Sequence, residues 1–187
     1  MTHIYYVRHA EPNYHNHDDV GRELTARGHT DCSLVTDFLL DKDIHVILTS
    51  PYRRAVDTIR PFAERVRLPI IHVQDFRERK VDAEWIEDFD AFSRRQWADF
   101  DFHLEGGESL REVQTRNIAA LTDVLRTHAG KNIVIGGHGT AVSTILNHYD
   151  PAFGYVQFER IRRIMPWIVR LDFDGTTFLR WESFVLK

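Results

Sequence analysis

Short apolar runs alternate with amphipathic segments along most of this chain, and this alternation constrains the fold more than any other feature. Four apolar runs have the length of buried strands: residues 4–7, 46–48, 70–73 and 132–135. Between them, residues 25–39 and 51–66 place apolar side chains at the spacing of a helix face. Strands that alternate with helices favour a parallel sheet covered on both sides. We therefore expect an α/β fold, a three-layer sandwich with a mostly parallel central sheet and helices on both faces.

Polar caps indicate where several helices begin. Thr25 is a suitable N-cap for the first helix, and Ser50 is suited to cap the second with Pro51 in the first helical position. Residues 109–112 have the spacing of a capping box, which predicts a third helix start. We expect further helices near residues 83–100 and 140–147.

The C-terminal segment has the periodicity of strands. Every second residue from Trp167 to Phe173 is apolar, and the residues between them are mostly polar. Asp174-Gly175 is a turn signal, after which residues 178–184 can return as a second strand. The pattern predicts a C-terminal hairpin.

Composition narrows the class of protein. With 187 residues, of which 43% are hydrophobic and 28% charged, the chain fits a single domain over residues 1–187. Its net charge of −4 provides no basic surface for nucleic acid. No apolar run approaches the roughly 18 residues of a membrane helix, and no leader-like segment precedes the first strand, so our default expectation is the cytoplasm. Cys32, the only cysteine, is expected to be a core residue.

Three of the four expected core strands end in polar clusters. Arg8-His9 follows the first strand, residues 50–54 follow the second, and residues 136–140 follow the fourth. In open α/β sheets, ligands bind outside the carboxyl ends of the strands. We therefore expect these clusters, although far apart in the sequence, to converge on one site.

The residue types in these clusters suit phosphoryl transfer. Arg8 and Arg54 offer planar forks of donors that match the oxygens of a phosphoryl group. The glycine-rich turn at residues 136–139 allows a ligand to approach the backbone at a helix N-terminus. An unprotonated ring nitrogen of His9 can attack phosphorus. The pattern predicts a phosphate site with a nucleophilic histidine.

Residues 7–12, Val-Arg-His-Ala-Glu-Pro, resemble the Arg-His-Gly signature of the histidine phosphatase superfamily, which also contains the cofactor-dependent phosphoglycerate mutases. Further blocks similar to those of this family follow in order: residues 24–28, 50–58, 76–78, 106–109 and 137–139. The resemblance, to the phosphoglycerate mutase-like branch, extends from Val7 to Gly139. It implies a phosphatase that works through a phosphohistidine.

The resemblance also implies a role for each matching residue. His9 is the expected nucleophile, and Glu78 is the expected proton donor to the leaving oxygen. A substrate phosphate beside Glu78 would favour its protonated form, which suits a general acid. The expected phosphoryl clamp consists of Arg8, Arg54, His138 and Gly139.

The chain departs from the family pattern at two places. His15 stands where the family usually has asparagine, and residues 82–86 replace a Gly-x-Trp-Glu-Gly block that often follows the acid. Glu84 and Glu108 therefore stay open as alternative proton donors.

We expect a cytoplasmic hydrolase that cleaves a small phosphorylated substrate without a metal ion or cofactor. No nucleic acid or membrane partner is expected, and a homodimer is left open. A mutase-type phosphotransferase would use the same phosphohistidine. Two alternatives from other classes are a non-catalytic phospho-ligand binding module and a metallohydrolase built on His15, His17, Asp18 and Asp19. For this loop a solvated or substrate-facing role is favoured, because metal ligands normally stand on rigid elements.

Overall fold

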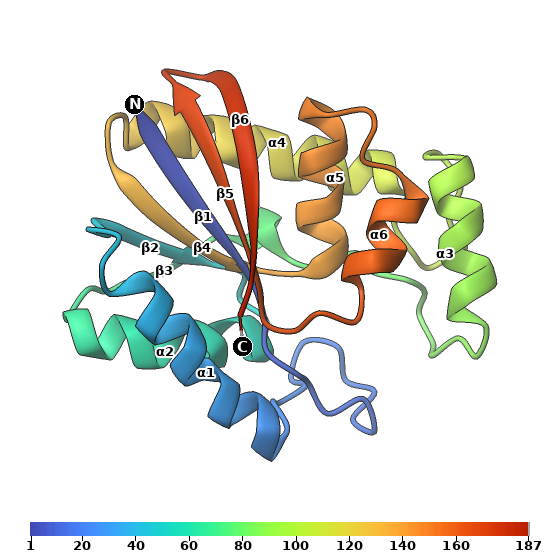
Figure 1. Ribbon diagram of the computed structural model, residues 1–187. Coiled ribbons are helices and arrows are strands. Elements are labelled where there is room, and N and C mark those ends of the chain that lie inside the picture. The colour runs from blue at the N-terminus through green and yellow to red at the C-terminus, as the bar shows by residue number, and fades with distance from the viewer. Residues whose placement is uncertain (187) are drawn as a thin grey trace.

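The computed structural model describes residues 1–186, and it contains a six-stranded sheet between two layers of helices (Figure 1). The strands are β1 (Thr2–Arg8), β2 (Val46–Thr49), β3 (Ile70–His72), β4 (Asn132–Gly137), β5 (Trp167–Asp174) and β6 (Thr177–Val185). The helices are α1 (Ala26–Leu39), α2 (Arg53–Val66), α3 (Phe89–Ala98), α4 (Leu110–Thr127), α5 (Gly139–Tyr149) and α6 (Tyr155–Ile161), with a 3-10 helix, η1 (Gln74–Phe76). The expected α/β sandwich is confirmed.

The strand order in the sheet is β3-β2-β4-β1-β5-β6. The first four of these strands are parallel, β5 is antiparallel to β1, and β6 returns antiparallel to β5. The mostly parallel sheet and the C-terminal hairpin are therefore confirmed. The register pairs Arg8 with Gly137 and Thr49 with Gly136, so the carboxyl ends of β1, β2 and β4 meet at one edge of the sheet.

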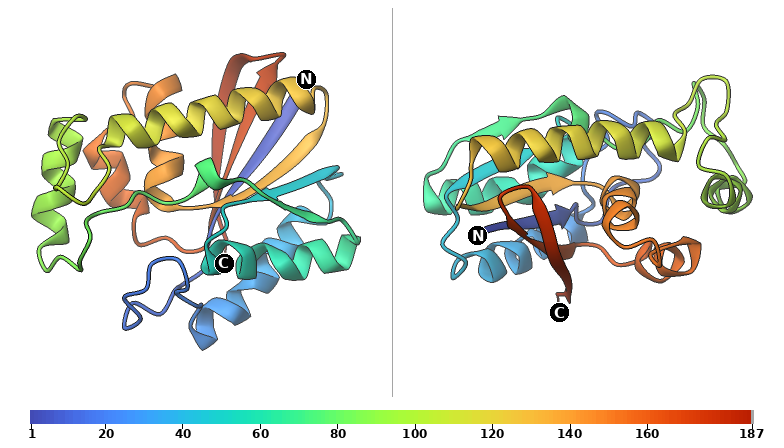
Figure 2. Two further views of the ribbon diagram at one scale, coloured as in Figure 1. Left: turned by 180° about the vertical axis from the view of Figure 1, so that it is seen from behind. Right: turned by 90° about the horizontal axis from the view of Figure 1, so that it is seen from above.

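Both faces of the sheet are buried along its four inner strands, β2, β4, β1 and β5, because alternate side chains of a strand point to opposite sides. The edge strands β3 and β6 are partly or fully exposed, so the apolar run at residues 70–73 is not a buried strand. In β1, Ile4 and Tyr6 pack in the core beneath α4 and α5, whereas Tyr5 and Val7 pack in the core beneath α1 and α2. The ribbon shows these two helical layers, with α3 and α6 beyond α5 (Figures 1 and 2). Cys32 of α1 is buried, as its position in the pattern predicts.

Two of the three predicted caps are confirmed, and the third is wrong. The Thr25 hydroxyl accepts a hydrogen bond from the Gly28 amide, and Ser109 forms a capping box at the start of α4. Ser50 does not cap α2, which begins at Arg53 without a side-chain cap. The Ser50 hydroxyl instead lies 2.7 Å from Nε2 of His138. The hydroxyl that the local sequence predicts as a helix cap therefore forms a hydrogen bond with a residue distant in the sequence.

The helix expected near residues 83–100 is shorter than predicted. Residues 83–88 contain no helix, and α3 starts at Phe89, where the Asp88 carboxylate accepts from the Ala91 amide. The helix expected over residues 140–147 is confirmed as α5, while the short α6 has no counterpart among the predictions. Within residues 1–186, no helix combines the length and the apolar character that crossing a membrane would require.

Candidate active site

A cavity of about 630 Å³ opens at the carboxyl edge of the sheet. It is lined by the end of β1, the start of α2, the segment from Glu78 to Phe89 and the start of α5. Five residues predicted from the sequence share its wall: Arg8, His9, Arg54, Glu78 and Gly139. The expected convergence of the polar clusters is therefore observed.

The His9 ring is fixed in one tautomer. Its Nδ1 lies 2.7 Å from the carbonyl oxygen of Ala10, and because a carbonyl can only accept, Nδ1 carries the proton. This leaves Nε2 unprotonated in the neutral ring. Burial, reinforced by the positive charges of Arg54 and Arg8, holds the pKa of His9 well below its ordinary value. His9 is therefore a neutral imidazole with a free lone pair at neutral pH.

Arg8 is held by the backbone at the end of α6. Its Nη1 donates to the carbonyl oxygens of Ile161 (2.7 Å) and Ile164 (3.1 Å), and its Nη2 donates to that of Arg162 (2.7 Å). Nε is buried and has no partner among residues 1–186. A Cβ at Gly139 would lie 2.9 Å from this nitrogen, so only glycine lets α5 begin so close to the guanidinium.

Arg54 lies in the first turn of α2, with its guanidinium over the Tyr52 ring. It donates to the backbone carbonyl of Asp19, and its Nη2 lies 3.1 Å from the Asp19 carboxylate. The same carboxylate pairs with Arg22 at 3.1 Å. Asp19 thus brings the loop before α1 onto two arginines of the cavity wall.

His138 is completely buried next to His9, and the centres of the two rings are 5.4 Å apart. Its Nε2 is bonded to the Ser50 hydroxyl, whereas Nδ1 has no partner within residues 1–186. Burial, followed by the charge of Arg54, holds the pKa of His138 well below its ordinary value. Unlike the other predicted residues, His138 is not part of the cavity wall in the described structure.

Glu78 is anchored at the N-terminus of α5. Its carboxylate accepts hydrogen bonds from the backbone amides of Arg79 (2.8 Å), Thr140 (3.0 Å) and Ala141 (3.2 Å). The positive end of a helix favours a carboxylate at this place. The bonds fix the side chain at the wall of the cavity that the end of β1 also lines.

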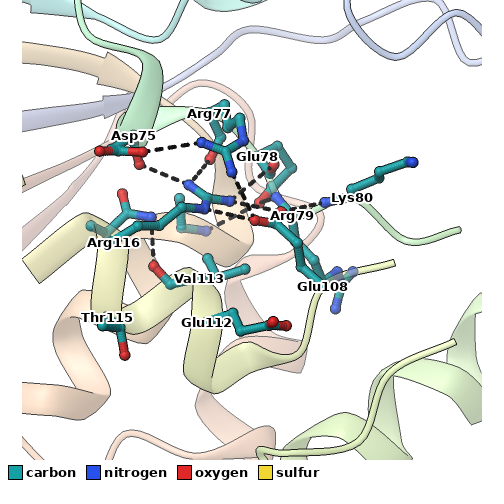
Figure 3. Close-up of polar contacts among 12 residues, drawn as sticks. Asp75, Arg77, Glu78, Arg79, Lys80, Glu108, Glu112, Val113, Thr115 and Arg116 are labelled. Atoms are coloured by element: carbon teal, nitrogen blue, oxygen red, sulfur yellow. Dashed lines mark hydrogen bonds and ion pairs between the residues drawn. The ribbon is translucent and has the colours of Figure 1, made fainter. Parts of the chain in front are cut away.

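The backbone around Glu78 is held by Arg116 of α4 (Figure 3). Arg116 donates to the carbonyl oxygens of Asp75 (2.7 Å), Arg77 (2.8 Å) and Glu78 (3.2 Å), and its Nε lies 2.9 Å from the Glu108 carboxylate. Although burial raises the pKa of Glu108, hydrogen bonds from Arg116 and the Lys80 amide outweigh it, and the net pKa is lowered.

These contacts separate the three candidate acids. Glu108 supports the loop from η1 to Lys80 and is not part of the cavity wall. Glu84 belongs to the wall but is exposed at its rim. Glu78 is the one of the three that combines a place in the wall with fixed hydrogen bonds.

The loop with the metal-like pattern makes other contacts. Asp19 pairs with arginines, and the His17 ring stacks on Trp85 at 4.1 Å between centres. Across residues 1–186, no group of three His, Cys, Asp or Glu side chains is arranged to hold a metal ion. Burial raises the pKa of Cys32 to about 11, in keeping with a core thiol.

Sequence reasoning missed two arginines of the cavity wall, Arg22 and Arg79. Arg22 is buried, and the rings of Tyr14 and Trp85 lie 5.5 Å and 5.7 Å from its guanidinium carbon. Arg79 is only 3% exposed and follows Glu78 directly. Neither arginine has a local sequence pattern that distinguishes it from a surface arginine. For Arg79, the position directly after the family block at residues 76–78 is the one signal in the sequence.

Comparisons with known proteins relate the chain to a family and to solved structures. Residues 4–181 fit the model of the histidine phosphatase superfamily (branch 1). The chain is 28% identical to an uncharacterized phosphatase, PhoE, of Bacillus subtilis, covering 86% of this chain and 84% of that protein. It is 27% identical to 2,3-bisphosphoglycerate-dependent phosphoglycerate mutase 2 of Gloeobacter violaceus, over 82% and 76% of the two chains. The fold is also that of YhfR from Bacillus stearothermophilus, with a TM-score of 0.82, 21% identity and coverage of 96% and 95%.

The two buried imidazoles should make the fold sensitive to acid. Their folded-state pKa values lie below the ordinary 6.5, so below pH 6.5 the unfolded chain binds more protons than the folded chain. The stabilisation is complete above about pH 6.5 and is lost as the pH falls toward the folded-state pKa values. Each histidine should contribute a loss of up to about 1.4 kcal/mol per pH unit.

Urea unfolding at pH 6.5 and pH 5.5 measures this loss. His9→Gln and His138→Gln should each make the free energy of unfolding less dependent on pH, and the double variant should show both effects together. A double variant that keeps the full pH dependence of the natural chain would contradict the assignment of neutral, buried imidazoles.

Proposed function

The chain belongs to the histidine phosphatase superfamily (branch 1), and we propose that it hydrolyses phosphomonoesters through a phosphohistidine formed on His9. One observation carries the proposal. His9 has an unprotonated Nε2 at a cavity whose wall contains the buried guanidinium groups of Arg8 and Arg54. A lone pair beside fixed positive charge is what attack on a dianionic phosphoryl group requires.

In the first step, His9 Nε2 forms a bond to phosphorus while the bond from phosphorus to the ester oxygen breaks. The Nε atom of Arg8 and the guanidinium of Arg54 compensate the charge on the equatorial oxygens. We assign the backbone at Gly139 and the His138 side chain to the same clamp; the His138 ring lies behind the described cavity wall, 5.4 Å from the His9 ring between centres, and its Nδ1 has no partner within residues 1–186. Because these donors are already fixed by the fold, little reorganisation is needed during the reaction.

Glu78 donates a proton in the first step and accepts one in the second step. Protonated in the substrate complex, it donates to the leaving oxygen, so that the alcohol departs neutral. The resulting carboxylate then takes a proton from the water that attacks the phosphohistidine. This second step releases inorganic phosphate and restores neutral His9. The amides of Thr140 and Ala141 fix the carboxyl group in the cavity wall that also contains His9, and this position supports the role. Because these amides bind the carboxylate form, protonation for the first step depends on the negative charge of the bound substrate.

The nucleophile can be tested directly. His9→Ala should lower phosphatase turnover by roughly 10⁴-fold or more, because a methyl group cannot attack phosphorus. His29→Ala, which removes an exposed histidine of α1, is the matched control and should keep full activity. During turnover, phosphate that is labile in acid and stable in base should be trapped on His9. Label on a serine or aspartate would overturn the mechanism, and a complete lack of turnover of activated aryl phosphates would favour a binding module.

A second prediction concerns charge compensation. If Arg8 and Arg54 supply the positive charge that metal ions supply in other phosphatases, activity should survive a strong chelator. Vanadate should inhibit, because it can adopt the five-coordinate geometry of the transition state. Initial rates with and without chelator, and a vanadate titration, measure both effects. Loss of activity that zinc or manganese restores would favour the metallohydrolase alternative.

The third prediction separates hydrolysis from mutase chemistry. A mutase must exclude water to retain its phosphohistidine, and the segment from Gln74 to Asp101 leaves limited material to close over the site, with only η1 and α3 as regular elements. With 3-phosphoglycerate and a trace of 2,3-bisphosphoglycerate, any phosphate release should be slow and isomerisation should not be rapid. Formation of 2-phosphoglycerate far faster than phosphate release would instead assign the chain to the mutases.

A further inference from the structure

Arg79 is a buried cation for which the proposed mechanism has no use. It lines the same cavity as His9, although only 3% of its surface is exposed. Within residues 1–186, no carboxylate forms an ion pair with its guanidinium, and the nearby Glu78 carboxylate bonds to the backbone amide of Arg79 instead. A buried charge without a partner is costly for a fold, and an anionic ligand would compensate it.

The guanidinium is held in one orientation. Nη1 donates to the side-chain oxygen of Gln96 at 2.6 Å, and the rings of Phe89 and Phe92 lie 5.3 Å and 5.0 Å from the guanidinium carbon. Gln96 is itself fixed, because its amide nitrogen donates to the carbonyl oxygens of Phe102 and Glu108, both at 2.9 Å. The orientation is therefore built into α3 and the loop after it.

The two remaining nitrogens of Arg79 point to the kind of ligand. Nε is buried without a hydrogen-bond partner, and Nη2 donates to no residue in the described part of the chain. Nε and Nη2 share one edge of the planar guanidinium, which is the edge that binds a carboxylate through two parallel hydrogen bonds. Burial lowers the pKa of Arg79 only to about 10, so the group remains charged at neutral pH.

We propose that Arg79 is a specificity residue that binds a carboxylate on the leaving group of the phosphomonoester. The inference rests on the proposed function. Arg79 follows Glu78, the proposed donor to the leaving oxygen, so its side chain starts within about 3.8 Å, one Cα spacing, of that residue. Arg8 and Arg54 belong to other elements, the end of β1 and the start of α2. Glu78 and Arg79 both line the cavity, so a leaving group that takes its proton from Glu78 lies in the cavity that the Arg79 side chain also lines.

The distribution of charge in the cavity supports the same assignment. The acidic residues of the wall, Glu78 included, are partly or fully exposed, whereas Arg8, Arg22, Arg54 and Arg79 are buried. The proposed mechanism uses Arg8 and Arg54 for the phosphoryl group, and Arg22 forms an ion pair with Asp19. Arg79 is left to provide positive charge for a second anionic group on the same substrate.

A pair of aryl phosphates tests this inference. The phosphate esters of 3- and 4-hydroxybenzoate carry a carboxylate, and those of the corresponding hydroxybenzamides carry a neutral group of nearly equal size. The natural chain should turn over at least one carboxylate with a kcat/KM about 10- to 100-fold above that of its amide, the range expected for hydrogen bonds to a charged group. Arg79→Gln should abolish this preference and change kcat/KM for the amides by no more than about twofold, while Arg79→Lys should retain part of it.

The outcomes distinguish this inference from the proposed function. Arg126→Gln, on the exposed last turn of α4, is the matched control and should behave as the natural chain. Turnover of the amides by Arg79→Gln shows that the site is intact, so a retained carboxylate preference in that variant would overturn the inference alone. An equal loss for both kinds of substrate would also overturn it, because Arg79 would then act on the phosphoryl group or the fold. Failure of the natural chain to hydrolyse any of the esters would contradict the proposed function itself.

Discussion

The structure depends on holding guanidinium groups inside the protein without neutralising them. Arg8 is bonded to three backbone carbonyls at the end of α6, and Arg79 is bonded to the side-chain oxygen of Gln96. Such oxygens satisfy the N–H donors but carry no net charge, so the positive potential of the cavity is preserved. A chain with a net charge of −4 thereby keeps a local cationic site for a dianionic ligand.

This constraint explains why segments distant in the sequence must come together. The carbonyls that hold Arg8 lie more than 150 residues after it, so the site is incomplete until α6 packs beside α5. Arg116 of α4 likewise donates to the backbone carbonyls of Asp75 and Glu78 (Figure 3). These hydrogen bonds hold the backbone of Glu78 where its side chain reaches the start of α5. The proposed acid, Glu78, and the Arg8-His9 strand end are therefore positioned by the same kind of contact, an arginine that donates to several backbone carbonyls of another segment.

The sequence predicted the parts that depend on periodicity and on family blocks. Apolar spacing located the strands, and their order in the sheet brought His9, Arg54 and Gly139 to one cavity. It failed where a long-range contact overrides a local signal, as when Ser50 bonds to His138 instead of capping α2. It also missed Arg79, because burial of an arginine depends on neighbours such as Gln96 that no local pattern specifies.

Arg54 differs from Arg8 and Arg79, because it pairs with the Asp19 carboxylate, as Arg22 does. That carboxylate is 39% exposed and can be solvated by water, whereas the Arg54 side chain is only 3% exposed and needs an anion beside it. A phosphoryl group that took the place of Asp19 would keep the guanidinium charge compensated. Under the proposed function, ligand binding at Arg54 would exchange one anion for another, so that the buried charge at this position stays compensated.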